Sequence, residues 1–109
     1  MRQVKLLTRE LEKRFAQVGR QDGKDPIVIA KFFYPMGSAT WYATEYDPEQ
    51  RNFFGYASLF GDWNDEWGYF SLDELQSFKG RFGLGIERDM YWEEKRASEV
   101  LGKEKVPWL

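Results

Sequence analysis

The spacing of apolar residues near the start of the chain predicts an amphipathic helix over residues 9–18. Apolar side chains recur every three or four positions, which places them on one face of a helix: Leu7, Leu11, Phe15 and Val18. Thr8 comes just before this run, where its hydroxyl can cap the first turn, and Gly19 follows it, where a helix commonly ends. We therefore expect this helix to bury one apolar stripe and to expose its charged residues.

The middle of the chain predicts strands. Residues 27–34 are apolar on both faces except for Lys31, as expected of a central strand. Residues 40–47 and 52–60 form two further strand-like runs, and the Asp-Pro-Glu sequence at 47–49 predicts a tight turn between them. We therefore expect these two runs to form an antiparallel hairpin.

The second half of the chain adds a short strand and a second helix. Residues 67–70 predict the strand. Ser71 and Glu74 have the spacing of a capping box, which predicts a helix over about 71–79 that ends at Gly80. An acidic loop from Gly61 to Glu66, around Trp63, is expected before the strand.

The C-terminal part is expected to contain a last strand at 88–92 and a short helix near 94–101. The order of elements predicts a single small α+β domain with a mainly antiparallel sheet of four to five strands. We place this domain at residues 1–92, with 93–109 as a charged C-terminal extension that packs on it.

Composition excludes several kinds of chemistry. The 109-residue chain has no Cys and no His, so disulfides, thiolate nucleophiles, imidazole metal sites and Ser-His catalysis are absent. Its net charge of −2 is not the basic footprint of a dedicated nucleic-acid binder. No apolar run approaches the roughly 20 residues of a membrane span. We expect a cytoplasmic protein without a cofactor and without membrane association.

Aromatic residues are concentrated in the predicted sheet, where 14 of the 20 lie between Phe32 and Phe70. Strict alternation would place Trp41 on one face of its strand and Tyr42 and Tyr46 on the other. Because two short helices can cover one face of a sheet, part of the second face would remain for a partner. The competing interpretation is that loops and the C-terminal tail cover it.

Four carboxylates lie within or beside the predicted strands: Glu45, Asp47, Glu87 and Asp89. Paired acids can hold Mg²⁺ or Mn²⁺ or act as general acid and base. However, Lys31, Arg51 and Arg88 lie in the same region and can neutralise them, and no motif fixes the spacing of metal ligands. We therefore favour structural ion pairs, and we assign neither a metal site nor a catalytic residue.

Several segments together resemble the bacterial domain-of-unknown-function family 2958 over about residues 6 to 92. They are Leu6–Leu11, Ala30–Phe33, the Trp-Tyr-Ala-Thr-Glu-Tyr-Asp-Pro motif at 41–48, Phe53–Gly55, Gly68–Leu75, Gly83-Leu84 and Ile86–Asp89. The resemblance implies a small accessory protein of plasmids, conjugative elements or phages. It supplies no catalytic residues, and it implies DNA-processing or defence machinery as neighbours.

Our leading hypothesis is a non-enzymatic binding module that contacts a protein or nucleic-acid partner through an aromatic sheet surface. The candidate binding residues are Trp41, Tyr42, Glu45, Tyr46, Asp47, Arg51, Glu87, Arg88 and Asp89. One alternative is a metal-dependent phosphodiesterase that uses the four carboxylates around one pocket. Another is a single-stranded nucleic-acid-binding protein that stacks bases on exposed rings. A second copy of the chain, forming a homodimer, is a further candidate partner.

Overall fold

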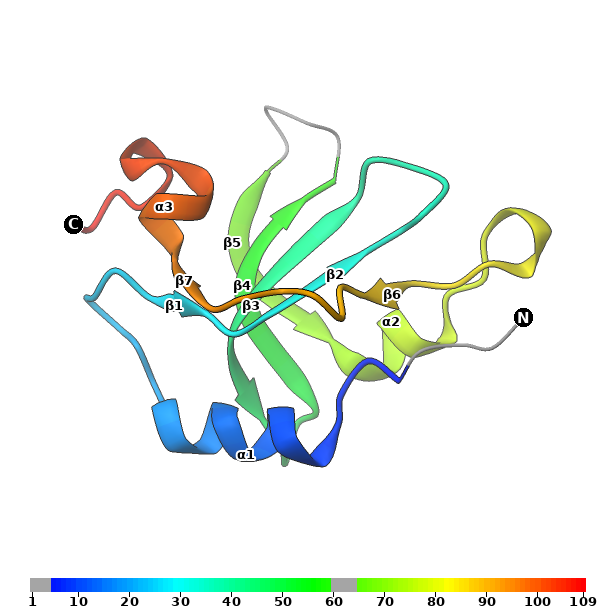
Figure 1. The fold of residues 1–109 in the computed structure, drawn as a ribbon, viewed down its shortest axis with the longest axis horizontal. Coiled ribbons are helices and arrows are strands. Elements are labelled where there is room, and N and C mark those ends of the chain that lie inside the picture. Colours follow the sequence, from blue (N-terminus) through cyan, green and yellow to red (C-terminus); the bar gives the residue numbers. More distant parts are fainter. Residues whose placement is uncertain (1–4, 60–64) are drawn as a thin grey trace.

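A computed structural model of the chain describes residues 5–59 and 65–109. It has a five-stranded antiparallel sheet in the order β5-β4-β3-β2-β6 and a small two-stranded sheet, β1-β7 (Figure 1). The elements are α1 (Arg9–Val18), β1 (Ile27–Val28), β2 (Ala30–Phe33), β3 (Thr40–Asp47), β4 (Asn52–Ser58), β5 (Glu66–Ser71), α2 (Leu72–Ser77), the 3-10 turn η1 (Arg81–Gly83), β6 (Glu87–Arg88), β7 (Lys95–Arg96), α3 (Ala97–Leu101) and the 3-10 turn η2 (Lys103–Lys105). The α+β class and the mainly antiparallel sheet predicted from the sequence are confirmed.

Local signals place the first helix and the central hairpin correctly. Thr8 Oγ1 accepts a hydrogen bond from Leu11 N at 3.2 Å, and Gly19 ends α1 with a φ of 68°. The β3–β4 hairpin turns where Asp47 Oδ1 accepts a hydrogen bond from Glu49 N at 2.9 Å. The bounds of α1 and β3 are those expected, because the caps of the helix and the turn that ends the strand depend on neighbours within a few residues.

The predicted strand over 27–34 is divided into two. β1 pairs with β7, whereas β2 joins the larger sheet between β3 and β6. The chain passes from one sheet to the other at Ile29, whose N–H donates to Ala43 O at 2.9 Å. The division follows from pairing with the C-terminal segment, residues 93–109. Ala97 N of this segment also donates a hydrogen bond to Pro26 O at 2.7 Å.

The predicted end of the second helix and the predicted extent of the last strand are wrong. Ser71 Oγ caps α2 by accepting from Glu74 N at 3.1 Å, but the helix ends at Ser77 and not at 79. Phe78 is extended because its ring packs edge-on against Tyr34, with 5.3 Å between ring centroids. The predicted strand over 88–92 is limited to β6, because Asp89 turns the chain: its Oδ1 accepts from Tyr91 N at 3.0 Å.

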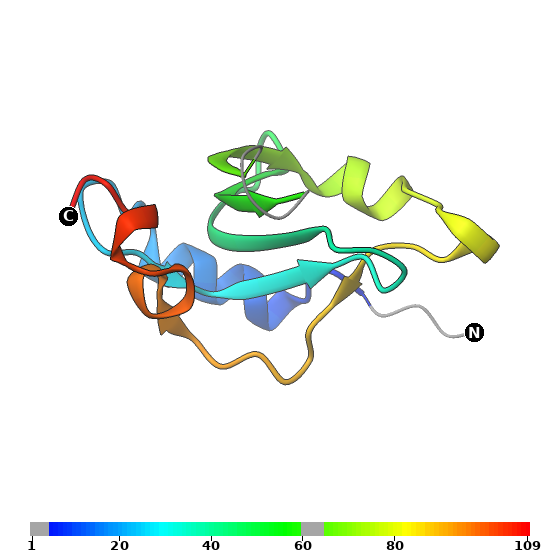
Figure 2. The same ribbon diagram turned by 90° about the horizontal axis from the view of Figure 1, so that it is seen from above.

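The two faces of the large sheet are covered by different elements. α1 and α2 cover the first face, over a core whose largest fully buried side chains include Phe32, Phe53 and Leu72. The C-terminal segment packs on the second face, where Val28, Ala97 and Val106 form a smaller core. Figure 2 shows this segment, in orange and red, running along the lower side of the view to its left end.

The predicted acidic loop around Trp63 falls mainly on residues 60–64, which lie outside the described residues. The same holds for Phe60, the last residue of the predicted third strand. Glu66, which we expected in this loop, begins β5.

Candidate functional site

Rings from β4 and β5 gather on the second face of the sheet. Phe53 of β4 packs against Phe15 of α1 on the first face, with 5.7 Å between ring centroids, so its neighbour Phe54 points to the other face. Tyr69 of β5 lies directly opposite Phe54 in the sheet and therefore shares that face. Trp67, two residues before Tyr69, does the same. These side chains form one aromatic surface across two neighbouring strands.

The C-terminal segment covers this surface only in part. Trp67 Nε1 donates to Lys105 O at 2.7 Å, and the Trp67 ring in turn packs edge-on against Tyr56, which is 4% exposed. Tyr69 remains 75% exposed and Trp108 40% exposed. The interpretation that the tail covers the second face is thus correct for its centre and wrong for its β4–β5 side.

We call the partly uncovered rings the ring strip: Phe54, Trp67, Tyr69 and Trp108. Consecutive rings touch, at centroid separations of 5.1 Å for Phe54 and Tyr69, 6.1 Å for Phe54 and Trp67, and 5.0 Å for Trp67 and Trp108. Each ring is held by its neighbours, so little side-chain freedom remains to be lost on binding.

Two clefts lie beside the ring strip, and both are lined by Glu45 and Phe54. One has a volume of about 380 Å³ and also includes Tyr69. The other, of about 200 Å³, includes Trp108. Glu45 Oε2 accepts a hydrogen bond from Gln21 N at 2.8 Å, which fixes the carboxylate between the two clefts.

A β-bulge decides which aromatic side chains of β3 reach the second face. The pairing of β3 with β4 shifts by one residue between Ala43 and Glu45, with Thr44 as the extra residue. Because of this shift, Tyr46 points to the same face as Trp41, and both pack on the first core. Strict alternation had placed Tyr46 with Tyr42, and that prediction is wrong.

The tyrosines on the two faces are held in partly buried positions. Burial raises the pKa of Tyr42, and the nearby charge of Asp65 raises it further. Burial also raises the pKa of Tyr46, with Arg51 acting in the opposite direction. Tyr42 lies against Trp92, 6.1 Å between centroids, and neither ring belongs to the ring strip.

The polar residues near the β3–β4 turn have structural partners. Asp47 caps the turn, as described above. Arg51 lies in the left-handed region with a φ of 55° and pairs with Asp73, at 2.8 Å from Nη2 to Oδ1. The hydrogen bond from Arg51 lowers the pKa of Asp73. This pair ties the hairpin to the first turn of α2.

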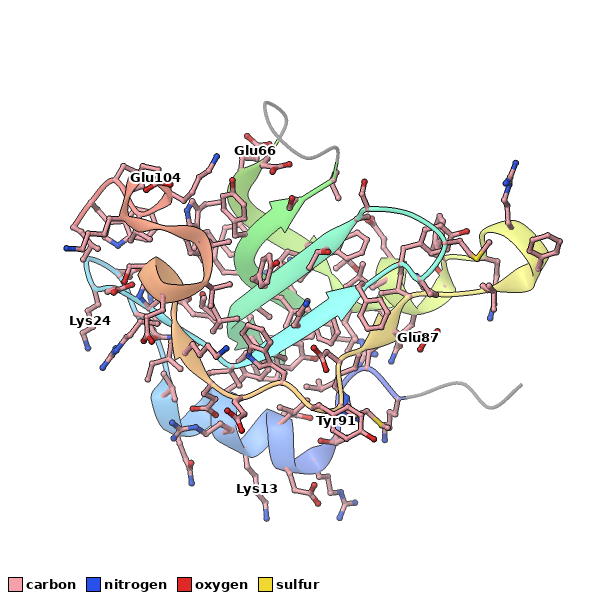
Figure 3. The ribbon with its side chains drawn as sticks, turned by 45° about the horizontal axis from the view of Figure 1, so that its top comes forward. Lys13, Lys24, Glu66, Glu87, Tyr91 and Glu104 are labelled. Carbon is pink, nitrogen blue, oxygen red and sulfur yellow. The ribbon has the colours of Figure 1, made fainter. Side chains whose placement is uncertain are left out.

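The remaining predicted residues lie around β6. Arg88 Nε donates to Lys5 O at 3.0 Å, and Asp89 lies 3.9 Å from Lys31 Nζ. Glu87 and Asp89 line a third cleft, of about 660 Å³, next to Tyr91, which is 89% exposed. Figure 3 shows Glu87 and Tyr91 on this segment, far from Glu66 at the start of β5.

The four predicted carboxylates thus lie in two separate clefts, two in each. Glu45 and Asp47 line one cleft, and Glu87 and Asp89 line another. Within the described part of the chain, no group of three or more Asp or Glu residues is placed to hold a metal ion. The single pocket that the phosphodiesterase alternative needs is not formed by these four residues in the described structure.

None of the ring strip residues is among the candidate binding residues expected from the sequence. Their signal was present, because Phe54 and Tyr56, and Trp67 and Tyr69, each repeat at two-residue spacing within a strand. Alternation alone could not tell which face the C-terminal segment would cover.

Comparison with known proteins agrees with the resemblance seen in the sequence. The model of a family described as "Protein of unknown function (DUF2958)" matches residues 4–101. The match extends beyond residue 92, where the resemblance was expected to stop, and includes all of α3. No curated protein and no solved structure matches the chain. Among the described residues, no helix is long and apolar enough to cross a membrane. The chain belongs to the DUF2958 family of proteins of unknown function.

Proposed function

We propose that this protein is a non-enzymatic interaction module that binds a partner protein through the ring strip. The observation that carries the proposal is the row of contacting, partly exposed rings beside two clefts on the second face of the sheet. Trp and Tyr dominate the binding energy of many protein interfaces, because they bury a large area and lose little side-chain entropy. Tyr69, 75% exposed yet in contact with Phe54, fits the centre of such an interface.

A protein partner fits this surface better than a single-stranded nucleic acid. Residues 52–78, which form β4, β5 and α2, contain five acidic residues and no Lys or Arg. A nucleic acid stacked on Tyr69 would bring its phosphates close to Glu45 and Asp47, which line the same cleft, where Arg20 is the one cation among the lining residues. The rings alone would suit bases, but the surrounding charge opposes the backbone.

The biological setting belongs to the same proposal. The family resemblance suggests a bacterial mobile genetic element, such as a plasmid, conjugative element or phage. We infer that the partner is part of the cytoplasmic machinery that such an element uses or meets, for example in DNA processing.

The proposal is tested by affinity capture from the native host, with nucleic acid retained, followed by mass spectrometry. We expect a defined partner protein to be captured by the unaltered chain and lost with Tyr69→Ala or with Tyr69→Ala/Trp108→Ala. Tyr91→Ala is the matched control, because it also removes a highly exposed ring but lies outside the ring strip.

Two outcomes would contradict the proposal. Either no partner is captured, or the same partner is captured by the Tyr69 variants as by the control. If the captured material disappears after nuclease treatment of the lysate, the nucleic-acid alternative is favoured instead. Circular dichroism of each variant checks that the fold is retained.

A further inference from the structure

β5 is an edge strand that lacks the usual protection against pairing. Within the described structure it pairs with β4 alone, and the register between them runs from Glu66 to Ser71 without a shift. It contains neither Pro nor Lys, the residues that commonly block such an edge. The opposite edge, β6, has only two residues, and both are charged. The open backbone of β5 can therefore accept another strand, whereas β6 is protected by its length and charge.

The two sides of β5 have different chemistry. Trp67 and Tyr69 point to the ring strip on the second face. The alternate residues point to the first face and begin with Glu66, which is exposed. Gly68 follows on that side, and a Cβ placed on it would meet no atom within 4 Å. A neighbouring strand would thus find rings on one side, and open space next to a carboxylate on the other.

Acidic groups lie at both ends of this open side. Glu66 is at the start of β5, and Glu74 lies in the first turn of α2, where it lines an apolar groove together with Phe70. The ion pairs found among the described residues involve neither Glu66 nor Glu74. Asp65 is already occupied, because it accepts from Ser58 Oγ at 2.9 Å and from Leu59 N at 3.1 Å.

We propose that β5 accepts, as an added strand, an extended segment of the partner protein in which apolar residues alternate with Lys or Arg. The apolar side chains would pack on Trp67 and Tyr69, and the basic side chains would lie over Gly68 between Glu66 and Glu74. Main-chain hydrogen bonds to β5 supply affinity in this mode, and the alternating side chains supply specificity. This inference rests on the proposed function, since it uses two rings of the same strip.

A second copy of the chain is a poorer occupant. Another β5 would bring the same carboxylates and no Lys or Arg, because residues 52–78 contain none. Like charges brought together across strands destabilise the pairing. Glu66 and Glu74 therefore favour a basic segment of another protein over a second copy of the chain.

The test is a selection of random displayed peptides, each about eight residues long and so able to span β5, against the immobilised full-length chain. We expect the enriched peptides to alternate apolar and basic residues. Their affinity should fall about tenfold for Glu66→Lys/Glu74→Lys, and this loss should shrink at high salt. Glu10→Lys/Glu87→Lys is the matched control, because Glu10 is an exposed residue of α1 and Glu87 lies in β6, at the opposite edge of the sheet from β5, and it should leave the affinity unchanged.

Backbone methylation separates strand addition from docking on rings alone. The N–H groups of an added strand point alternately toward β5 and away from it. N-methyl groups on every second residue of a selected peptide should abolish binding when they replace the N–H groups that point toward β5. The same groups shifted by one residue face away from β5 and should be tolerated. In the complex, the β5 amides that do not bond to β4 should exchange with solvent more slowly than in the free protein.

The outcomes distinguish this inference from the proposed function. No enrichment, enrichment without basic residues, or equal binding of both methylated peptides would overturn strand addition. If strand addition is overturned in this way but the ring strip variants still lose the native partner in the capture experiment, the proposed function stands without strand addition. If Tyr69→Ala changes neither partner capture nor peptide binding, both proposals fail.

Discussion

Two glycines that face each other in the sheet should respond in opposite ways to the same substitution. Gly55 of β4 and Gly68 of β5 are direct neighbours in the pairing of these strands. A Cβ on Gly55 would lie 1.9 Å from Tyr42 O and 3.0 Å from Ala43 Cα, both backbone atoms of β3. A Cβ on Gly68 would meet nothing within 4 Å. Changing each to Ala therefore adds the same methyl group to a blocked site and to an open one.

The size of the effect at Gly55 follows from what must move. An oxygen–carbon contact of 1.9 Å is more than about 1 Å too short for packed atoms, and a backbone carbonyl cannot rotate away as a side chain can. β3 and β4 must separate locally, which costs about 1–3 kcal/mol for overpacking. It also costs about 1 kcal/mol for each ladder hydrogen bond that is lost. We expect Gly55→Ala to lower the free energy of unfolding by about 3–5 kcal/mol, a large share of the roughly 5–15 kcal/mol of a small domain.

Equilibrium unfolding in urea, followed by tryptophan fluorescence, measures both variants. Gly68→Ala should leave the free energy of unfolding unchanged or raise it by less than about 1 kcal/mol, because Ala restricts the unfolded chain. If Gly55→Ala is as stable as the unaltered protein, the close approach of β3 and β4 described here is wrong. If both variants lose the same free energy of unfolding, the loss comes from replacing a glycine anywhere in these strands and not from the contact with Tyr42.

Three further predictions concern buried polar contacts and one ion pair. Gln21→Ala should lower the free energy of unfolding by about 2–3 kcal/mol, because this buried amide bonds the backbone of two other segments; denaturation in urea measures it, and a loss below 1 kcal/mol would contradict it. Trp67→Phe removes the indole hydrogen bond to the C-terminal segment and should increase solvent quenching of Trp108, while unchanged quenching would show that this bond does not hold the segment. The pKa of Asp73 is lowered below its usual 3.8 by Arg51, so their pair stabilises the fold above pH 3.8 and loses this effect as the pH falls through the lowered pKa. Asp73→Asn should reduce the acid dependence of stability in that range, and an unchanged pH profile would refute the coupling.

Local signals in the sequence determined the elements whose ends depend on nearby residues. The helix 9–18 starts at Thr8 and ends at Gly19, as their side-chain and backbone preferences require. The strand 40–47 and its turn at Asp47 also form as predicted. For the helix and for the turn, the capping hydrogen bonds join residues no more than about four positions apart, so the local sequence is sufficient to place them.

Only the tertiary structure decided which rings are available to a partner. The bulge at Thr44 reverses the alternation within β3, and it depends on how β3 meets β4. The division of 27–34 and the partial covering of Trp67 both depend on the C-terminal segment, through contacts between residues more than 35 positions apart along the chain. Packing between distant segments does not leave a periodic pattern in either one. Strand periodicity therefore indicated that rings lie on both faces, and the position of the C-terminal segment determined that Trp67 is partly covered while Tyr69 stays exposed.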